Sequence, residues 1–158
     1  MKPLPLLPPL TPVVESDAAE LKLFMASVIA ESVTQEEPLL SDFVRNVSDN
    51  VDWWQDHQDE CVHLKCTVNG CIVGVVLVKE FWNLCSLFVS PSLQKRGLGH
   101  SLLDAAIDAC RGRSPKGEIW LNASPNAAPF YERAGFTVRE SSQALPKGYV
   151  AMRLVLTA

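Results

Sequence analysis

The sequence lacks the segments that would direct a protein into or across a membrane. The chain of 158 residues has no apolar run of about 18 residues, so no transmembrane helix is expected. Prolines at positions 3, 5, 8, 9 and 12 interrupt its apolar start, and no small-residue cleavage site follows, which argues against a secretory signal peptide. We interpret residues 1–9 as an extended, proline-rich lead-in to one domain that spans residues 1–158.

The sequence also lacks the cysteine spacings of a metal or redox site. Its five cysteines are an odd number, and they form no Cys-x-x-Cys pair and no Cys/His ligand pattern, so no metal is expected. We predict free thiols in a reducing, cytoplasmic compartment. A nucleophilic cysteine stays open, although nothing in the sequence places a base beside one. Four cysteines fall in predicted strands and one in a predicted helix: Cys61, Cys66, Cys71, Cys85 and Cys110.

An excess of positive charge is missing as well. The chain has 14 Lys and Arg against 18 Asp and Glu, which gives a net charge of −4 and a pI of about 5.3. Neither nucleic acid nor an anionic membrane is therefore expected as a partner. A hydrophobic content of 47% and a charged content of 20% are typical of a globular domain with one sizeable core. The sequence leaves a homodimer open.

One segment does carry a specific pattern. An apolar strand is followed by a basic, glycine-bearing turn, Gln94-Lys-Arg-Gly-Leu-Gly99, and then by a helix with apolar periodicity. Gly97 and Gly99 allow positive φ and leave room for a ligand to approach the main chain. The helix start has N–H groups without intrahelical partners and a dipole that favours negative charge. With Lys95 and Arg96 beside it, the turn is predicted to bind a phosphate or pyrophosphate.

Three phosphate motifs compete for this turn, beside a glycine turn that serves only to start a helix. A P-loop requires a lysine followed by Ser or Thr, but His100-Ser101 follows Gly99. A dinucleotide fingerprint requires a third glycine where Leu102 stands. The remaining pattern, Gln-x-x-Gly-x-Gly between a strand and a helix, resembles the GNAT superfamily of acyl-CoA N-acyltransferases. In that family the motif binds the pyrophosphate of coenzyme A through backbone amides.

A second segment strengthens this resemblance. Asn126-Ala-Ala-Pro-Phe-Tyr-Glu-Arg-Ala-Gly-Phe136 follows another apolar strand, and Asn126 is predicted to cap a short helix that ends at Gly135. The segment resembles the second GNAT signature. The resemblance implies that Tyr131 points at the thiol of coenzyme A and protonates the departing thiolate, and that Asn126 contacts the pantetheine arm. A core aromatic is the alternative role for Tyr131.

The resemblance also implies the set of residues around the cofactor. Backbone groups of one strand would pair with pantetheine, the turn and helix start would bind pyrophosphate, and the second signature with the strand before it would complete the site. These residues are Leu87, Phe88, Val89, Gln94, Lys95, Arg96, Gly97, Leu98, Gly99, His100, Ser101, Asn122, Asn126 and Tyr131, with Tyr131 as the catalytic acid.

The resemblance does not assign a general base. Asn83 stands where some relatives carry a glutamate, and an amide accepts no proton. Glu80 and His63 are the substitutes, each expected as a solvated surface side chain, and ordered water is the further alternative. The segments expected to shape the acceptor pocket, residues 31–56, 80–83 and 142–148, match no motif.

Periodicity predicts the strands and helices of an α/β fold, and the resemblance implies that its sheet is mixed. Asp17 and Glu20 have capping-box spacing at the start of the first helix. The order β-α-α-β-β-β-α-β-α-β-β is that of GNAT folds, which implies a sheet that splays beside the strand before the pyrophosphate turn. Strands are expected at 10–15, 61–68, 71–80, 83–89, 118–123, 136–140 and 149–156, and helices at 16–33, 39–54, 97–111 and 126–134.

The function implied is transfer of the acetyl group of acetyl-CoA to a primary amine of a small molecule or peptide. The acyl group could also be longer. The main alternative is a GNAT-like module that binds acyl-CoA as a sensor or interaction partner without turnover. A nucleotide-binding regulator is a third class. The acceptor amine cannot be identified from the sequence.

Overall fold

The computed structural model describes residues 7–157, and its element order is the one predicted. Part of the lead-in, residues 1–6, lies outside the described residues, and residues 7–9 form neither helix nor strand. The strands are β1 (Leu10–Pro12), β2 (Cys61–Val68), β3 (Cys71–Lys79), β4 (Asn83–Val89), β5 (Glu118–Ala123), β6 (Thr137–Val138) and β7 (Val150–Val155). The helices are α1 (Ala18–Val28), α2 (Leu39–Asp56), α3 (Leu98–Cys110) and α4 (Ala128–Arg133).

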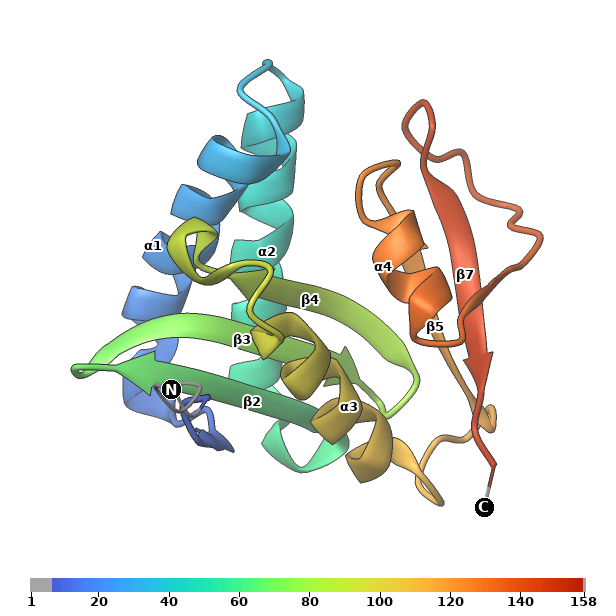
Figure 1. Ribbon diagram of the computed structural model, residues 1–158, viewed down its shortest axis with the longest axis horizontal. Helices are drawn as coiled ribbons and strands as arrows, with labels where there is room; N and C mark the ends of the chain where they lie inside the picture. Colours follow the sequence, from blue (N-terminus) through green and yellow to red (C-terminus); the bar gives the residue numbers. More distant parts are fainter. Residues whose placement is uncertain (1–6, 158) are drawn as a thin grey trace, which may run out of the picture.

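All seven strands belong to one mixed sheet in the order β1-β2-β3-β4-β5-β7-β6 (Figure 1). The three pairs β1–β2, β2–β3 and β3–β4 are antiparallel, and the pair β4–β5 is parallel. The pairs β5–β7 and β7–β6 are again antiparallel. β4 lies in the middle, as its nearly continuous apolar sequence predicts.

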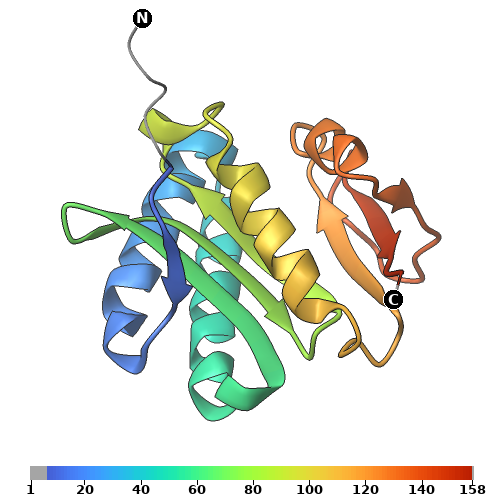
Figure 2. The same ribbon diagram turned by 60° about the horizontal axis from the view of Figure 1, so that its bottom comes forward.

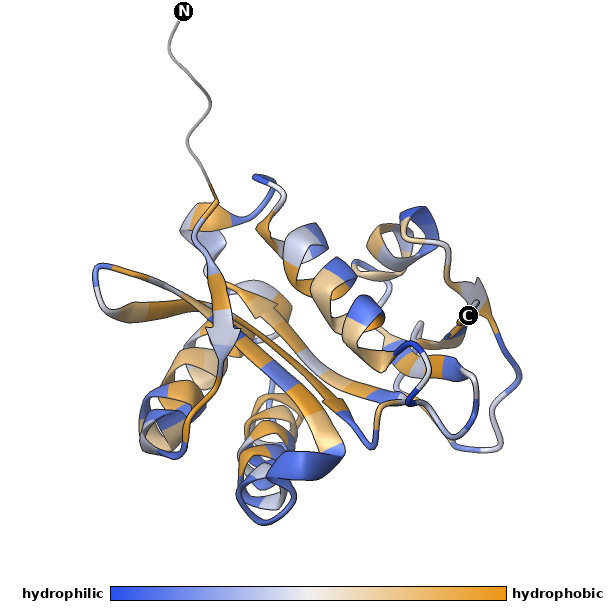
Figure 3. Cartoon of the chain, turned by 90° about the horizontal axis from the view of Figure 1, so that it is seen from below, coloured by the Kyte–Doolittle hydropathy of each residue, from blue (hydrophilic) through white to orange (hydrophobic). Residues whose placement is uncertain are grey.

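Helices cover both faces of the sheet (Figures 2 and 3). α3 packs on β2, β3 and β4 from one side, while α1 and α2 pack together on the other. Each side has its own apolar core, one including Leu102 and Leu103 of α3 and the other including Met25 of α1 and Trp54 of α2. Gly74 of β3 lets α3 come close, because a Cβ there would lie 2.9 Å from Leu102 Cδ1.

Covering both faces overturns one expectation. Strict alternation predicts His63 of β2 at the surface, but the residue is only 7% exposed. Its ring packs edge to face on the Trp54 ring, with 4.8 Å between the two ring centroids. α2 supplies that tryptophan over the face that alternation assigns to solvent. An alternating strand therefore does not imply a solvated face when helices pack on both sides.

Local details at several element ends also differ from the prediction. The capping box between Asp17 and Glu20 is wrong: the Asp17 carboxylate accepts the Val14 N–H and pairs with Lys65, while Glu20 accepts the Ile72 N–H. Both carboxylates thus serve contacts that sequence spacing does not reveal. β1 is shorter than expected, β6 has only two residues, and the first helix continues as a π turn over Ile29–Val33.

The sheet splays between β4 and β5. Within residues 7–157 the ladder between these strands has one register pair, Asn83 with Trp120, supported by a bond from Trp120 N–H to Trp82 O of 2.7 Å. The register against β3 shifts between Leu84 and Ser86, so that Cys85 is an extra residue in β4. A bulge bends its strand, and this one falls where β4 leaves β5. The gap opens toward the carboxyl ends of both strands.

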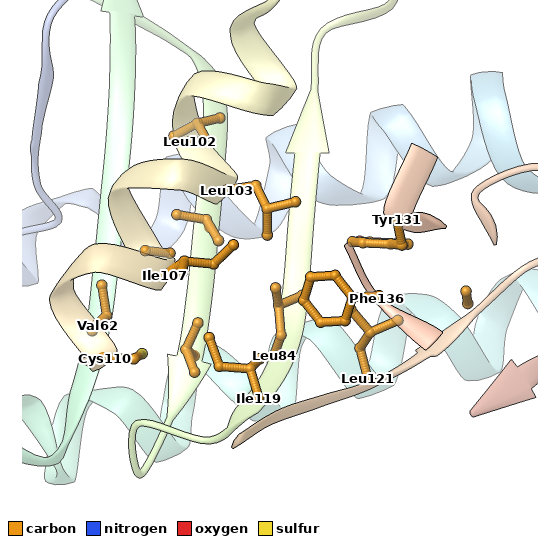
Figure 4. Close-up of a cluster of buried hydrophobic side chains, with 14 of the residues drawn as sticks. Val62, Leu84, Leu102, Leu103, Ile107, Cys110, Ile119, Leu121, Tyr131 and Phe136 are labelled. Atoms are coloured by element: carbon orange, nitrogen blue, oxygen red, sulfur yellow. The ribbon is translucent and has the colours of Figure 1, made fainter. Parts of the chain in front are cut away.

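Apolar side chains fill the base of this gap (Figure 4). Leu84 of β4, Ile119 and Leu121 of β5, and Phe136 after α4 meet beneath α3 in a single buried cluster. The two parts of the sheet therefore share a core although they share almost no ladder.

The five cysteines are free and lie on the predicted element types. Cys66 and Cys110 are buried, Cys61 and Cys85 are half-buried, and Cys71 is exposed. Among the described residues, no three His, Cys, Asp or Glu side chains are grouped so that they could hold a metal ion. No helix in the same part of the chain combines the length and apolar character needed to cross a membrane.

Candidate active site

The basic turn joins β4 to α3 and is held by its own residues. Gly97 has a φ of +87° and Lys95 a φ of +66°, both in the left-handed region. The Gln94 amide donates to Val89 O at 3.0 Å, which ties the turn to the end of β4. Gly97 is the N-cap of α3 and supplies no side chain, so the first N–H groups of the helix are left for another acceptor.

Gly97 and Gly99 differ in backbone conformation. The sequence allows positive φ at both glycines, and Gly97 adopts it, while Gly99 lies in the first turn of α3 with ordinary helical geometry. A Cβ on Gly99 would lie 3.5 Å from the Phe130 ring, an ordinary contact distance. The absence of a side chain at Gly99 thus keeps the space beside α4 open rather than permitting a special backbone conformation.

A cavity of about 410 Å³ lies under this turn, between β4, α3 and α4. We call it the turn cavity. Nine of the predicted cofactor residues line it: Leu87, Val89, Gln94, Lys95, Gly97, Gly99, His100, Asn126 and Tyr131. The other five do not: Phe88 and Asn122 line neighbouring cavities, Leu98 is buried in the core, and Arg96 and Ser101 lie outside the lining.

Tyr131 is positioned by the end of α4. The Phe136 N–H donates to Tyr131 O and the Gly135 N–H donates to Glu132 O, each at 3.0 Å, which is a Schellman motif with Gly135 at φ +100° as predicted. The start of the helix differs from the prediction. The N-cap of α4 is Ala127 rather than Asn126, and no side chain caps the helix. The Ser124 hydroxyl accepts the Ala127 N–H in the turn before α4, and Asn126 lines the turn cavity.

The Tyr131 ring is packed edge to face against two phenylalanines. Its centroid lies 5.1 Å from that of Phe130 and 5.6 Å from that of Phe136. The residue is 8% exposed, and burial raises the pKa of its hydroxyl. At neutral pH the group is therefore protonated. It has the packing role considered as the alternative, and it also lines the turn cavity.

Tyr131 lines a second cavity that faces the other side of the sheet. This helix-side cavity, of about 230 Å³, lies among β4, β5, α2 and the π turn after α1. Leu87, Ala127 and Tyr131 line both cavities, so these residues form the boundary between them. The wall of the helix-side cavity is mostly apolar and includes Ile29, Val33, Phe43, Asn46, Val47, Leu121, Asn122, Ser124 and Tyr149.

A third cavity adjoins the helix-side cavity at the start of β4. We call it the amide cavity because four asparagines line it, together with Lys79 and the loop before β7: Asn46, Asn50, Asn83 and Asn122, with Leu145, Pro146 and Tyr149. Phe43, Asn46, Cys85, Asn122 and Tyr149 also line the helix-side cavity. The segments expected to shape the acceptor pocket, residues 31–56, 80–83 and 142–148, thus contribute residues to the helix-side and amide cavities.

None of the expected substitute bases lies on these walls. Glu80 is exposed, in a turn, and accepts the Trp82 indole N–H at 3.2 Å. His63 is buried against Trp54, and burial lowers its pKa to about 4. Cys85 does line the helix-side and amide cavities, but burial raises the pKa of its thiol to about 11, which suppresses the nucleophilic thiolate.

Several lining residues were missed by sequence reasoning. Arg133 and Phe130 of α4 line the turn cavity, and Phe43, Asn46 and Tyr149 line the other two. The basic residue in the last turn of α4 could have suggested Arg133. Phe130 lies inside the second signature, directly before Tyr131. The other three have no local sequence signal, because only the fold brings α2 and the residue before β7 close to β4.

Comparisons with known proteins agree with this geometry. The model of the acetyltransferase (GNAT) domain family matches residues 29–156. An uncharacterized N-acetyltransferase of Methanocaldococcus jannaschii is 30% identical over 111 residues, which are 63% of this chain and 47% of that protein. The chain thus spans about half the length of this relative.

Solved structures share the fold. The GCN5-related N-acetyltransferase of Rhodopseudomonas palustris superposes with a TM-score of 0.75 at 21% identity, over 94% of this chain and 96% of that one. YncA of Salmonella typhimurium, solved with acetyl-CoA, gives 0.71 at 18% over 96% and 95%. The PaiA N-acetyltransferase of Thermoplasma acidophilum, solved with coenzyme A, gives 0.70 at 15% over 94% and 98%. The splayed sheet, the glycine turn and the family match together establish that this chain belongs to the GNAT acetyltransferase family.

Proposed function

We propose that this protein transfers the acetyl group of acetyl-CoA to a primary amine of a small molecule or peptide. The observation that supports the proposal is the position of Tyr131 on the boundary between the turn cavity and the helix-side cavity. A donor that enters under the glycine turn and an acceptor that enters from the helix side would meet at this side chain.

The turn cavity suits a diphosphate ester such as coenzyme A. The start of α3 offers backbone N–H groups, and the lining carries the cations Lys95 and Arg133. These cations stand out in a chain whose net charge is −4. Beyond Asn83, β4 has no ladder with β5 in the described residues, so its edge is available to an extended pantetheine arm.

The transfer requires one bond to form and one to break. The amine nitrogen attacks the thioester carbonyl, the C–N bond forms, the C–S bond breaks, and the departing thiolate takes up a proton. Tyr131 is the proton donor in this proposal, because its hydroxyl is protonated at neutral pH and the residue lines both cavities. The attacking nitrogen loses one proton to solvent, and the Tyr131 phenolate regains one proton from solvent.

We further propose that the amine reaches the site already neutral. Among residues 7–157 no carboxylate or histidine lines the helix-side cavity, and Asn83 cannot accept a proton. The acidic limb of the pH–rate profile should then follow the pKa of the acceptor. Profiles for two amines of different pKa test this, on wild type and on Glu80→Gln and His63→Gln. A limb that stays fixed between acceptors and disappears in one variant would identify that residue as the base.

Release of free thiol from acetyl-CoA, followed with a panel of primary amines, tests the whole proposal. Acetylated product should appear in proportion to thiol, and only when an amine is present. Binding of acetyl-CoA without turnover across the panel would favour the alternative, a module that senses acyl-CoA. Competition by ATP instead of coenzyme A would favour a nucleotide-binding regulator.

A further inference from the structure

The amide cavity has an unusual charge pattern for a site that takes an amine. Asn46, Asn50, Asn83 and Asn122 line it. In the part of the chain that the structure describes, no aspartate or glutamate lines this cavity or the adjoining helix-side cavity. A second ammonium group on the acceptor would find no counter-ion here. The amide groups instead offer N–H donors to an oxygen-bearing group.

Of the described residues that line the amide cavity, Lys79 is the one with a charged side chain. Its ammonium lies 4.9 Å from the centroid of the Trp53 ring, and that ring is stacked on His57 at 4.3 Å. Within residues 7–157 no carboxylate lies within 4.0 Å of Lys79. The cation is therefore held in place by an aromatic face and has no anionic partner in the described part of the chain.

Asn50 provides a second, independent sign of a missing partner. The residue is 6% exposed and lines the same cavity, yet its amide Nδ2 has no hydrogen-bond partner among the described residues. A buried donor without a partner costs roughly 1–3 kcal/mol. An acceptor atom on a bound molecule would remove that cost.

We propose that the amide cavity binds a carboxylate on the acceptor substrate, with Lys79 as its counter-ion and Asn50 as a neutral hydrogen-bond donor. The inference rests on the proposed acetyl transfer, because it assumes that the amine of the same molecule reaches Tyr131 through the helix-side cavity. Asn46, Asn122 and Tyr149 line both cavities, so one short molecule can occupy the two together. The substrate class is then an aminocarboxylate, free or at the end of a short peptide.

Paired acceptors test this directly. Glycine, β-alanine, γ-aminobutyrate and 5-aminovalerate are compared with their carboxamides and with diamines of equal length. For the best-fitting length, kcat/KM for the carboxylate should exceed that for its carboxamide by about 10-fold or more, because a charge-assisted hydrogen bond is replaced by a neutral one. Diamines should be the poorest acceptors. A diamine or carboxamide that equals the carboxylate at every length overturns the proposal.

Variants of Lys79 assign the effect to the cavity. Lys79→Gln should reduce the preference for carboxylate over carboxamide to near unity, and Lys79→Glu should turn it toward diamines. Lys116→Gln is the matched control, since Lys116 also lies over tryptophan rings, those of Trp82 and Trp120, but does not line the amide cavity. A preference that survives in folded Lys79→Gln contradicts the assignment.

Binding separates this inference from the proposed reaction. If no acceptor is acetylated, the reaction is wrong, and the same pairs are measured by calorimetry on protein saturated with coenzyme A. Tighter binding of the carboxylate, lost in Lys79→Gln and kept in Lys116→Gln, would still support the cavity's specificity. Equal binding of both members of each pair, or binding of neither, would refute it.

Discussion

At the scale of single residues, Tyr131 has two environments at once. Its ring is part of an aromatic cluster with Phe130 and Phe136, and its position also borders two cavities. The packing explains why the residue is well placed, and the hydroxyl is what the proposed chemistry uses. A substitution that removes only the hydroxyl separates the two contributions.

Tyr131→Phe keeps the ring and its packing. We expect turnover to fall roughly 10²-fold, the lower end of general acid catalysis, with little change in coenzyme A affinity. Steady-state kinetics with a saturating amine, together with calorimetry for coenzyme A, measures both quantities. Full activity at neutral pH would show that the hydroxyl is dispensable and that Tyr131 serves the core alone.

His63 should make the stability of the fold depend on pH. Burial lowers its pKa from 6.5 to about 4, while the charge on Asp17 partly opposes this shift. Between these two pH values the unfolded chain binds a proton that the folded chain excludes, so the free energy of unfolding falls as the pH falls from about 6.5 to about 4. The full effect is on the order of 3 kcal/mol.

Chemical denaturation at several pH values measures this dependence. His63→Phe retains an aromatic ring against Trp54 and removes the titrating group, so its stability should change less over the same interval. An identical slope in the wild type and the variant would assign the pH dependence to other groups.

Some site residues could be predicted from the sequence and others could not, for a physical reason. Gly97, Gln94 and Tyr131 lie in short motifs whose local geometry depends on neighbours along the chain. Lys79 and Asn50 have no such motif, because their significance arises only when β3 and α2 meet around one cavity. The buried state of His63 was missed for the same reason.

At the scale of elements, the turn and the first residues of α3 act together. Gly97 provides the left-handed backbone, and Gly99 keeps the side facing Phe130 open. Gly74 lets α3 lie close to the sheet, because a methyl group at that position would press on Leu102. The position of the helix start is therefore set both by the turn and by the packing behind it.

Gly99→Glu should weaken coenzyme A binding by roughly 10-fold or more, because it places a carboxylate beside the helix start that is proposed to bind pyrophosphate. Gly99→Ala is the control. Its Cβ makes an ordinary contact with Phe130, and alanine favours the helix by up to about 1 kcal/mol. Calorimetry and thermal denaturation of both variants test the placement. Unchanged affinity in Gly99→Glu would show that the ligand binds elsewhere.

Elements with a strong apolar pattern were predictable to the residue, as β4 and β5 show. Elements whose ends depend on distant contacts were not. The first helix was expected to start from a capping box, but Lys65 and the Ile72 N–H attract the two carboxylates instead. β6 is short because its pairing with β7 covers only Thr137 and Val138.

At the scale of the whole molecule, the family resemblance supplied the topology and the structure supplied the shape of the opening. Strand order and the parallel contact between β4 and β5 follow the predicted element order. The bulge at Cys85 and the side chains that fill the gap depend on several elements that are distant in the sequence, so no local pattern contains them.

Coenzyme A should stabilise the entire fold, because the turn cavity draws its walls from both sides of the gap, with Leu87 on β4 and Asn126 before α4. At a ligand concentration of 100 times Kd, linkage gives about 2.7 kcal/mol. For a domain of this size the melting temperature should rise by roughly 5–10 °C. Thermal denaturation with and without millimolar coenzyme A measures the shift. Its absence would count against binding in this cavity.

Within residues 7–157 a single ladder pair joins β4 to β5, so the backbone connection between the two parts of the sheet lies at one end of the gap. Trp82, Trp120 and the ammonium of Lys116 pack together at this connection, and Tyr131 lies farther away on α4, the helix that follows β5, where it lines the two cavities. A small rotation about this connection moves atoms far from it more than atoms close to it. A substitution at Trp120, which touches neither the turn cavity nor the helix-side cavity, would therefore alter the distance between Tyr131 and Leu87 more than the distance across the join itself.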